Sequence, residues 1–226
     1  MTSKEEKKKV GIFGGTFDPV HLGHIKAAQE IRRILGLSKV LFIPSFIPPH
    51  KNHADTTPSE HRLKMLELAL DPYPYFEIST YELDKEGTSY TVDTLKHFAS
   101  QEPGTGFYFI VGSELFETID TWKNYNDLFE LANFAVIERP GFSEEDPPSL
   151  PLAIEADFRY YMSQDDVKIF KNKYSKEIAF THIRGIRVSS TEIRNRMKSG
   201  ESIKDLVPQE VESYVIRNGL YTGVAS

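Results

Sequence analysis

Two glycines and two histidines near the start of the chain have the types and spacing that chemistry on a phosphate needs. Gly14-Gly15 is followed by Thr16, and then by His21 and His24, which lie three residues apart. Glycine lets the backbone approach a ligand closely, and hydroxyl and imidazole groups can donate hydrogen bonds. If a helix begins here, its free N–H groups and dipole also favour an anion. The stretch therefore predicts a phosphate-handling site.

The elements that must position these residues alternate along the chain. Apolar or alternating runs predict strands at residues 10–13, 39–44, 75–81, 107–111, 134–137 and 177–183. Helical spacing and capping signals predict helices from residue 22, from Thr57 as N-cap, over 92–98, 113–119 and 125–131, from Ser189, and over 208–218 closed by Gly219. This alternation predicts an α/β fold, a Rossmann-like, doubly wound, mainly parallel sheet with helices on both faces and a small C-terminal helical part.

Several polar or small residues follow the predicted strands. Ligands in such folds sit beyond the carboxyl ends of the strands. Gly14, His21, Lys51, Gly112 and Arg139 all occupy such places. We therefore expect them to meet at one edge of the sheet, where they support the fold and the site together.

The length of 226 residues fits a single domain over 1–226. Residues 1–9 are expected to be a frayed basic lead-in, 142–180 an insertion, and 189–226 the C-terminal helical part. Within the insertion, the proline-rich start and later charges predict a loop and an extra helix. Its aromatic residues are expected to pack within the segment: Phe158, Tyr160 and Tyr161.

The composition excludes several classes of protein. No cysteine is present, which excludes disulfides and thiolate metal sites and fits a reducing cytoplasm. No apolar run reaches the ~18 residues of a membrane span, and the charged start is unlike a secretory signal. The net charge of −6 argues against a general nucleic-acid binder. We expect no nucleic-acid or membrane partner and a cytoplasmic protein.

Common phosphate motifs are absent from the sequence. It has no G-x-x-x-x-G-K-[ST] and no G-x-G-x-x-G after the first strand, and it has no zinc signature. The polar groups at the strand ends are rich in donors and cations and poor in bases with an obvious role. Such a set suits transfer of a phosphoryl or nucleotidyl group between two anions, where the catalyst aligns the anions and neutralises charge on phosphorus.

Two ordered motifs resemble a known superfamily. The sequence GGTFDPVHLGH carries the [HT]-x-G-H signature of the nucleotidyltransferases, and VSSTEIR at 188–194 resembles their second signature. Within that superfamily, PPHK at 48–51, SYTVDTL at 89–95, FIVGSE followed by Trp122, and ERPG at 138–141 resemble bacterial nicotinate-nucleotide adenylyltransferases. The resemblance covers nearly the whole chain except 1–9 and roughly 142–180.

The resemblance implies a role for each matching residue. His21, His24 and Arg194 would act on the reacting phosphates, and Trp122 would stack on the pyridine ring. The residues implied in binding ATP are Gly14, Gly15, Thr16, Phe17, Lys51, Gly112, Glu114, Arg139, Ser190 and Thr191. Those implied in binding the mononucleotide, with Trp122, are Thr88, Tyr90 and Thr91. Metal ligands on the protein are not implied.

Two positions keep an alternative open. Glu114 stands where the family usually has an aspartate, and it can also be explained as an acid at a helix start. Lys51, taken alone, is equally well explained as an exposed loop lysine.

The resemblance implies that the protein transfers the adenylyl group of ATP to nicotinate mononucleotide, giving nicotinate adenine dinucleotide and pyrophosphate in NAD biosynthesis. Magnesium would be carried by the oxygens of ATP and pyrophosphate. Two alternatives stay open: a sibling adenylyltransferase that uses nicotinamide mononucleotide or phosphopantetheine, and a non-catalytic nucleotide-sensing module. The preference for acid or amide on the ring stays open too, as does formation of a homo-oligomer.

Overall fold

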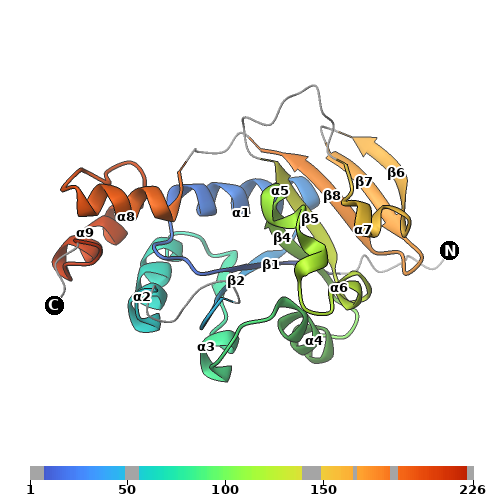
Figure 1. The fold of residues 1–226 in the computed structure, drawn as a ribbon, viewed down its shortest axis with the longest axis horizontal. Helices are drawn as coiled ribbons and strands as arrows, with labels where there is room; N and C mark the ends of the chain where they lie inside the picture. The colour runs from blue at the N-terminus through green and yellow to red at the C-terminus, as the bar shows by residue number, and fades with distance from the viewer. Residues whose placement is uncertain (1–7, 49–55, 139–148, 165–166, 184–187, 223–226) are drawn as a thin grey trace.

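The computed structural model describes residues 8–48, 56–138, 149–164, 167–183 and 188–222. Its strands form one eight-stranded sheet in the order β3-β2-β1-β4-β5-β8-β7-β6 (Figure 1). The first six strands in this order pair in parallel, and the last two pair antiparallel. The strands are β1 (Lys9–Gly15), β2 (Lys39–Pro44), β3 (Phe76–Ile78), β4 (Gly106–Gly112), β5 (Asn133–Glu138), β6 (Phe158–Gln164), β7 (Val167–Asn172) and β8 (Glu177–His182).

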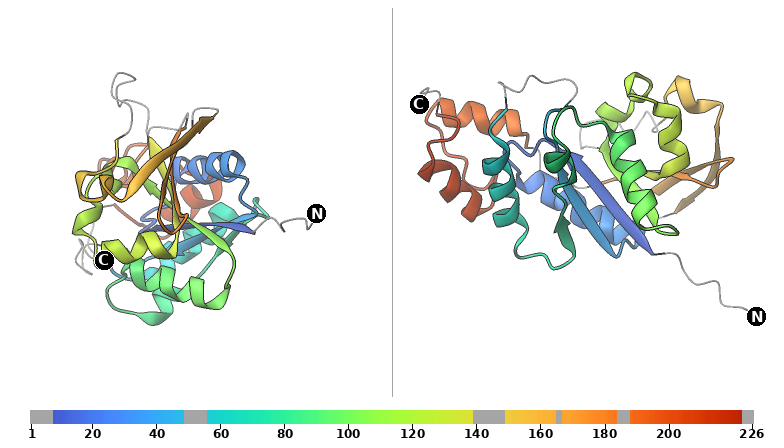
Figure 2. Two further views of the ribbon diagram at one scale, coloured as in Figure 1. Left: turned by 90° about the vertical axis from the view of Figure 1, so that its right-hand side faces the viewer. Right: turned by 90° about the horizontal axis from the view of Figure 1, so that it is seen from below.

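Helices connect the strands and complete the C-terminal part. They are α1 (Leu22–Leu35), α2 (Ser59–Leu70), α3 (Tyr81–Lys85), α4 (Thr91–Gln101), α5 (Ser113–Phe116), the 3₁₀ helix η2 (Ile119–Thr121), α6 (Tyr125–Leu131), α7 (Leu152–Glu155), α8 (Ser190–Lys198) and α9 (Gln209–Arg217). The two C-terminal helices and the β6–β7 hairpin lie at opposite ends of the molecule (Figures 1 and 2). The predicted α/β class and mainly parallel sheet are confirmed.

Two hydrophobic cores cover the two faces of the sheet. Val40 and Phe42 of β2 pack in one core with helices α1, α2 and α9, whereas Leu41 and Ile43 pack in the other with α4, α5 and α6. Successive residues of a strand point to opposite faces, so a continuously apolar strand such as β2 can serve both cores. The sheet is therefore buried on both faces, and a ligand is expected to bind at the carboxyl ends of its strands.

The strand order reverses between β1 and β4. The chain runs from β1 outward through β2 to β3, and then returns to place β4 on the other side of β1. Connections leave β1 and β4 in opposite directions, and the crevice between them is where doubly wound folds bind ligands. This switch point places the residues after Gly15 opposite those after Gly112.

The segment around the aromatic cluster differs from expectation. After the short helix α7, strands β6 and β7 pair antiparallel where a charged helix is expected. Aromatic and β-branched residues favour a strand that packs on a sheet face. Tyr160 lies edge-on to Phe170 and Lys171 Nζ lies over the Tyr161 ring, so both tyrosines make contacts within the segment, although they are 59% and 56% exposed. Phe158 instead packs against Phe129 of α6, outside the segment.

Three predicted boundaries also change. The strand expected over 75–81 is only β3, because a helix begins at Tyr81, and the helix expected over 113–119 ends at Phe116. Helix α2 begins at Ser59 with Pro58 at the N-cap, so the predicted cap at Thr57 is wrong. The close of α9 at Gly219 is confirmed, since this glycine has a φ of 60° and Leu220 N–H donates to the Val215 carbonyl.

Candidate active site

The two histidines cap helix α1 and bond to each other. The backbone N–H of His24 donates to Nδ1 of His21, and the backbone N–H of His21 donates to Nδ1 of His24, each at 3.3 Å. The imidazole rings are stacked, with centroids 3.6 Å apart. Because both Nδ1 atoms accept, each neutral ring carries its proton on Nε2. The capping box therefore sets the tautomer in which Nε2 is the donor.

Small residues let the rings around this turn pack closely. Phe17 has a φ of 49°, and its ring lies edge-on to His24 with centroids 5.1 Å apart. A Cβ on Gly15 would come within 3.1 Å of the Phe17 ring, and one on Gly23 within 3.0 Å of His21 Nδ1. A side chain at either position would displace an aromatic ring of the turn, so the glycines are needed here for close approach.

A cavity of about 1550 Å³ opens at the switch point. Pockets for one drug-sized ligand are about 300–1,000 Å³, so this one has room for two. Most of the predicted site residues line it. Those are Gly14, Gly15, Thr16, Phe17, His21, His24, Tyr90, Thr91, Gly112, Glu114, Trp122 and Ser190.

The other predicted site residues are either absent from the described lining or outside the described part of the chain. Thr88, Thr191 and Arg194 are not among the described lining residues, and Thr88 instead forms a parallel bridge with Ile47. Lys51 and Arg139 lie outside the described residues. The structure thus brings together the turn after β1, the segment before α4 and the segment after β4.

Hydrogen bonds connect helix α8 to the turn that carries the histidines. Ser190 Oγ donates to the Pro19 carbonyl at 2.9 Å, and Arg194 Nη1 donates to the Asp18 carbonyl at 2.7 Å. Arg194 Nη2 lies 3.3 Å from Thr191 Oγ1. The N-cap predicted at Ser189 is confirmed by its bond from Glu192 N–H. The two sequence motifs, far apart in the chain, therefore form one structural unit.

The chain is similar to a protein-family model and to proteins that carry a name. The family model described as cytidylyltransferase-like matches residues 12–196. A protein of Geobacillus kaustophilus, named probable nicotinate-nucleotide adenylyltransferase, is 40% identical over 96% of this chain and 88% of its own length. One of Clostridium novyi with the same name is 41% identical over 95% of this chain and 99% of its own. The chain belongs to the cytidylyltransferase-like family, among its nicotinate-nucleotide adenylyltransferases.

Solved structures of this family share the fold. The nicotinic acid mononucleotide adenylyltransferase of Plasmodium falciparum, in complex with NaAD, has a TM-score of 0.70 at 22% identity and covers 95% of this chain and 97% of its own. A crystal structure from Vibrio parahaemolyticus, named "putative nicotinate-nucleotide adenylyltransferase", has a TM-score of 0.64 at 17% identity and covers 96% of this chain and 97% of its own. At these identities the likeness concerns the fold.

A buried arginine that the sequence reasoning missed joins two loops of this adenylyltransferase fold, the β1–α1 loop and the β2–α2 loop. Arg62 of α2 is 1% exposed. Its guanidinium donates to four carbonyl oxygens at 2.8–3.3 Å, those of Thr16, Ser45, Phe46 and Thr57. Burial lowers the pKa of Arg62, and the nearby Asp18 carboxylate opposes that shift. The signal was present in the sequence, because residue 62 lies on the apolar stripe of its helix.

Asp18 links this arginine to the C-terminal part. Its carboxylate, in a residue 2% exposed, accepts from Thr57 N–H at 3.2 Å and from the Tyr221 hydroxyl at 2.6 Å. Burial, and then the Asp18 charge, raise the pKa of Tyr221, so the phenol stays a donor. The Asp18 carbonyl also accepts a hydrogen bond from Arg194 of α8. Asp18 therefore connects the histidine turn both to α8 and to Tyr221.

Glu82 of α3 is a second buried acid that the sequence reasoning missed. It lines the cavity, is 8% exposed, and accepts from Thr94 Oγ1 at 2.6 Å. Burial raises its pKa above 4.5, although hydrogen bonds from Thr94 and Ser89 partly oppose the shift. Burial of an acid disfavours its charged form, so the folded protein holds the Glu82 proton more tightly than the unfolded chain does.

This shift predicts a pH dependence of stability. The folded protein binds the proton more tightly than the unfolded chain, so the contribution of Glu82 is present at pH values below its unfolded pKa. It is lost as the pH rises through the folded pKa. We expect the wild type to lose free energy of unfolding relative to Glu82→Gln across that window. Urea unfolding from pH 4 to pH 8 measures it, and a constant difference between the two proteins would contradict the prediction.

The described residues contain no group of three His, Asp or Glu side chains placed to hold a metal ion. The buried acid Asp18 at the cavity has both carboxylate oxygens engaged by protein donors. No helix in the described part of the chain has the length and apolar character to cross a membrane.

Proposed function

We propose that the protein transfers the adenylyl group of ATP to nicotinate mononucleotide, giving nicotinate adenine dinucleotide and pyrophosphate. The observation that carries the proposal is the shared cavity. It joins the paired histidines of the β1–α1 turn to Tyr90, Thr91 and Trp122 on the other side. Relatives that are about 40% identical over nearly the whole chain carry the corresponding name.

The chemistry follows from the charges of the two substrates. A phosphate oxygen of the mononucleotide attacks the α-phosphorus of ATP, a P–O bond forms, and the bond to the β-phosphate oxygen breaks as pyrophosphate leaves. A phosphate monoester has a second pKa of about 6, so it is already ionised near neutrality and needs no general base. The protein has to align two anions and stabilise charge on the transferred phosphorus.

We assign these tasks to residues from three elements. Nε2–H of His24 and of His21 donates to the reacting phosphates, and Gly14, Gly15, Thr16 and Phe17 shape the cradle. Ser190, Thr191 and Arg194 of α8 hold the leaving pyrophosphate from the far side of the turn. Lys51, Gly112, Glu114 and Arg139 complete the ATP site, and Thr88 belongs with the mononucleotide-binding residues. ATP enters as its magnesium complex, with the metal on phosphate oxygens.

A panel of acceptors tests the proposal. The protein is incubated with magnesium, ATP and one acceptor at a time, and pyrophosphate is measured. We expect release with nicotinate mononucleotide well above that with phosphopantetheine. Release with phosphopantetheine alone would support a sibling transferase. ATP binding without turnover for any acceptor would support a nucleotide-sensing module.

Trp122 offers a direct view of the acceptor, because it is the one tryptophan of the chain. Its indole lies edge-on to Phe109, with ring centroids 5.9 Å apart, and it lines the cavity. Stacking of a base on an aromatic side chain contributes about 1–3 kcal/mol. We expect nicotinate mononucleotide to quench the Trp122 fluorescence, and Trp122→Ala to raise the KM for the acceptor about tenfold with kcat little changed.

Tyr125→Ala is the control for this variant. Tyr125 packs against the same core from the next turn of chain and is not among the described lining residues. We expect its KM values to stay near those of the wild type. A rise in the KM for ATP alone in Trp122→Ala would refute the stacking assignment.

A further inference from the structure

Lys123 stands out among the charged residues of the cavity. The described lining residues include four acids and the two histidines, but Lys123 is the one lysine or arginine among them. It directly follows Trp122 and precedes helix α6. A cavity that must hold anions therefore has, in its described wall, a single permanently charged cation.

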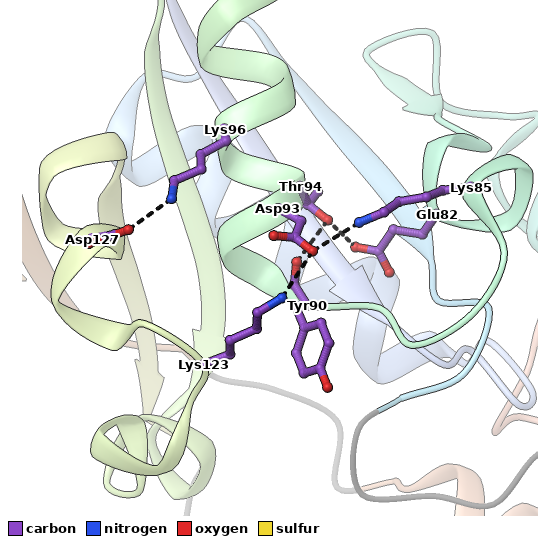
Figure 3. A network of polar contacts seen from close by, with 8 residues as sticks. All are labelled: Glu82, Lys85, Tyr90, Asp93, Thr94, Lys96, Lys123 and Asp127. Carbon is purple, nitrogen blue, oxygen red and sulfur yellow. Dashed lines mark hydrogen bonds and ion pairs between the residues drawn. The ribbon is translucent and has the colours of Figure 1, made fainter.

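Weak contacts hold the ammonium group in place. Lys123 Nζ lies 4.1 Å from the centroid of the Tyr90 ring and 3.6 Å from Asp93 Oδ2 (Figure 3). Asp93 is bound more closely by Lys85, at 2.9 Å, and this hydrogen bond is the main reason that the pKa of Asp93 is lowered. Asp93 is thus already neutralised by Lys85. Lys123 also lowers the pKa of Asp93, but less than Lys85 does, and 43% of its side chain is exposed, so its charge can reach a ligand.

A second lysine on the same surface shows the contrast. Lys96 of α4 pairs with Asp127 of α6 at 2.8 Å and is not among the described lining residues (Figure 3). Exposed pairs of this kind contribute little to stability. Lys96 therefore has an ordinary surface ion pair. Lys123 lines the cavity, and its ion pair with Asp93 is longer and is shared with Lys85.

We propose that Lys123 is a specificity-determining residue that binds the carboxylate on the ring of the acceptor. The inference rests on the proposed function, which puts the acceptor phosphate at the histidines, where the new bond forms. The ring must then lie at the other end of the mononucleotide, at Trp122, and Lys123 is its immediate neighbour in the chain. An ammonium group favours a ring acid over the neutral amide, so Lys123 selects the nicotinate over the nicotinamide form.

Two acceptors that differ only in this group provide the test. We measure kcat/KM of the wild type and of Lys123→Met with nicotinate mononucleotide and with nicotinamide mononucleotide. Hydrogen bonds to charged groups are worth about tenfold or more in affinity. We expect Lys123→Met to lose about 10- to 100-fold with the acid and little with the amide, so that the preference collapses. Lys123→Arg should restore most of it.

Two lysine variants act as controls. Lys96→Met should leave both acceptors unchanged, and Lys85→Met should not reduce the preference for the acid. Equal losses for both acceptors in Lys123→Met would place the lysine at the phosphate and overturn the proposal. So would an unchanged preference, or a loss in Lys85→Met as large as in Lys123→Met, which would mean that Lys123 acts only through Asp93.

The wild type separates this inference from the function on which it rests. Turnover of nicotinate mononucleotide with a preference that survives Lys123→Met would overturn the role of Lys123 and keep the proposed function. Absence of turnover with either pyridine mononucleotide would overturn both.

Discussion

His24→Ala is expected to lower kcat by about 10²- to 10³-fold, the usual cost of removing one donor that stabilises charge in a transition state. The imidazole lies at the start of α1, and its Nδ1 accepts from the His21 N–H, so the neutral ring carries its proton on Nε2, the atom that we assign to phosphate. The KM for each substrate should change much less than kcat, because the interaction strengthens as charge develops. Steady-state release of pyrophosphate measures both. A kcat near that of the wild type would refute the role of His24.

His24→Gln separates this role from the structural one. Glutamine at the third position of a helix can return a hydrogen bond to the N-cap N–H, which keeps the capping box that His24 provides to His21. We expect His24→Gln to be about as inactive as His24→Ala but to unfold at a higher urea concentration. Equal stability of the two variants would mean that the reciprocal cap contributes nothing measurable.

The local parts of the site could be predicted from the sequence because their signals lie close together in the chain. The glycine pair, the histidine spacing and the apolar repeat after Leu22 all lie within one strand–turn–helix unit. The hydroxyl cap at Ser189 is local in the same way and is confirmed. Such units are determined by capping and by the period of the apolar pattern, and both can be read from a single sequence.

The hairpin of β6 and β7 shows where the local signal was ambiguous. Lysines interspersed with Ile169 and Phe170 match a charged helix as well as a half-exposed strand. The choice between them depends on a partner, which here is β8, paired with β7 from Val167 to Lys171. A neighbour supplied by the fold decided the structure, as it often does for β propensity.

The long-range contacts of the site could not be predicted. Arg62 reaches Thr16, which is 46 residues away, and Asp18 meets Tyr221 across 203 residues. No spacing rule connects such residues, because the fold alone brings their loops together. For the same reason Lys123, beside the better marked Trp122, drew no attention in the sequence, although it lines the cavity.

Arg62→Met is expected to lower the free energy of unfolding by about 3–5 kcal/mol, the range for removing one partner from a buried charged network. Methionine fills similar space, but it would leave four carbonyl groups of two loops without their donor, and it would leave the buried Asp18 without the cation beside it. Urea unfolding followed by Trp122 fluorescence measures the change.

The matched control is Arg33→Met, because Arg33 is exposed on α1 and should change stability by less than about 0.5 kcal/mol.

Arg62→Lys keeps the positive charge but loses the planar fork that reaches several carbonyls at once, so its stability should lie between those of the wild type and Arg62→Met. If Arg62→Lys were as stable as the wild type, charge next to Asp18 would be sufficient. If Arg62→Met were as stable as Arg33→Met, the carbonyl contacts would not hold the two loops together. The intermediate value is expected because both the charge and the geometry of the guanidinium are used.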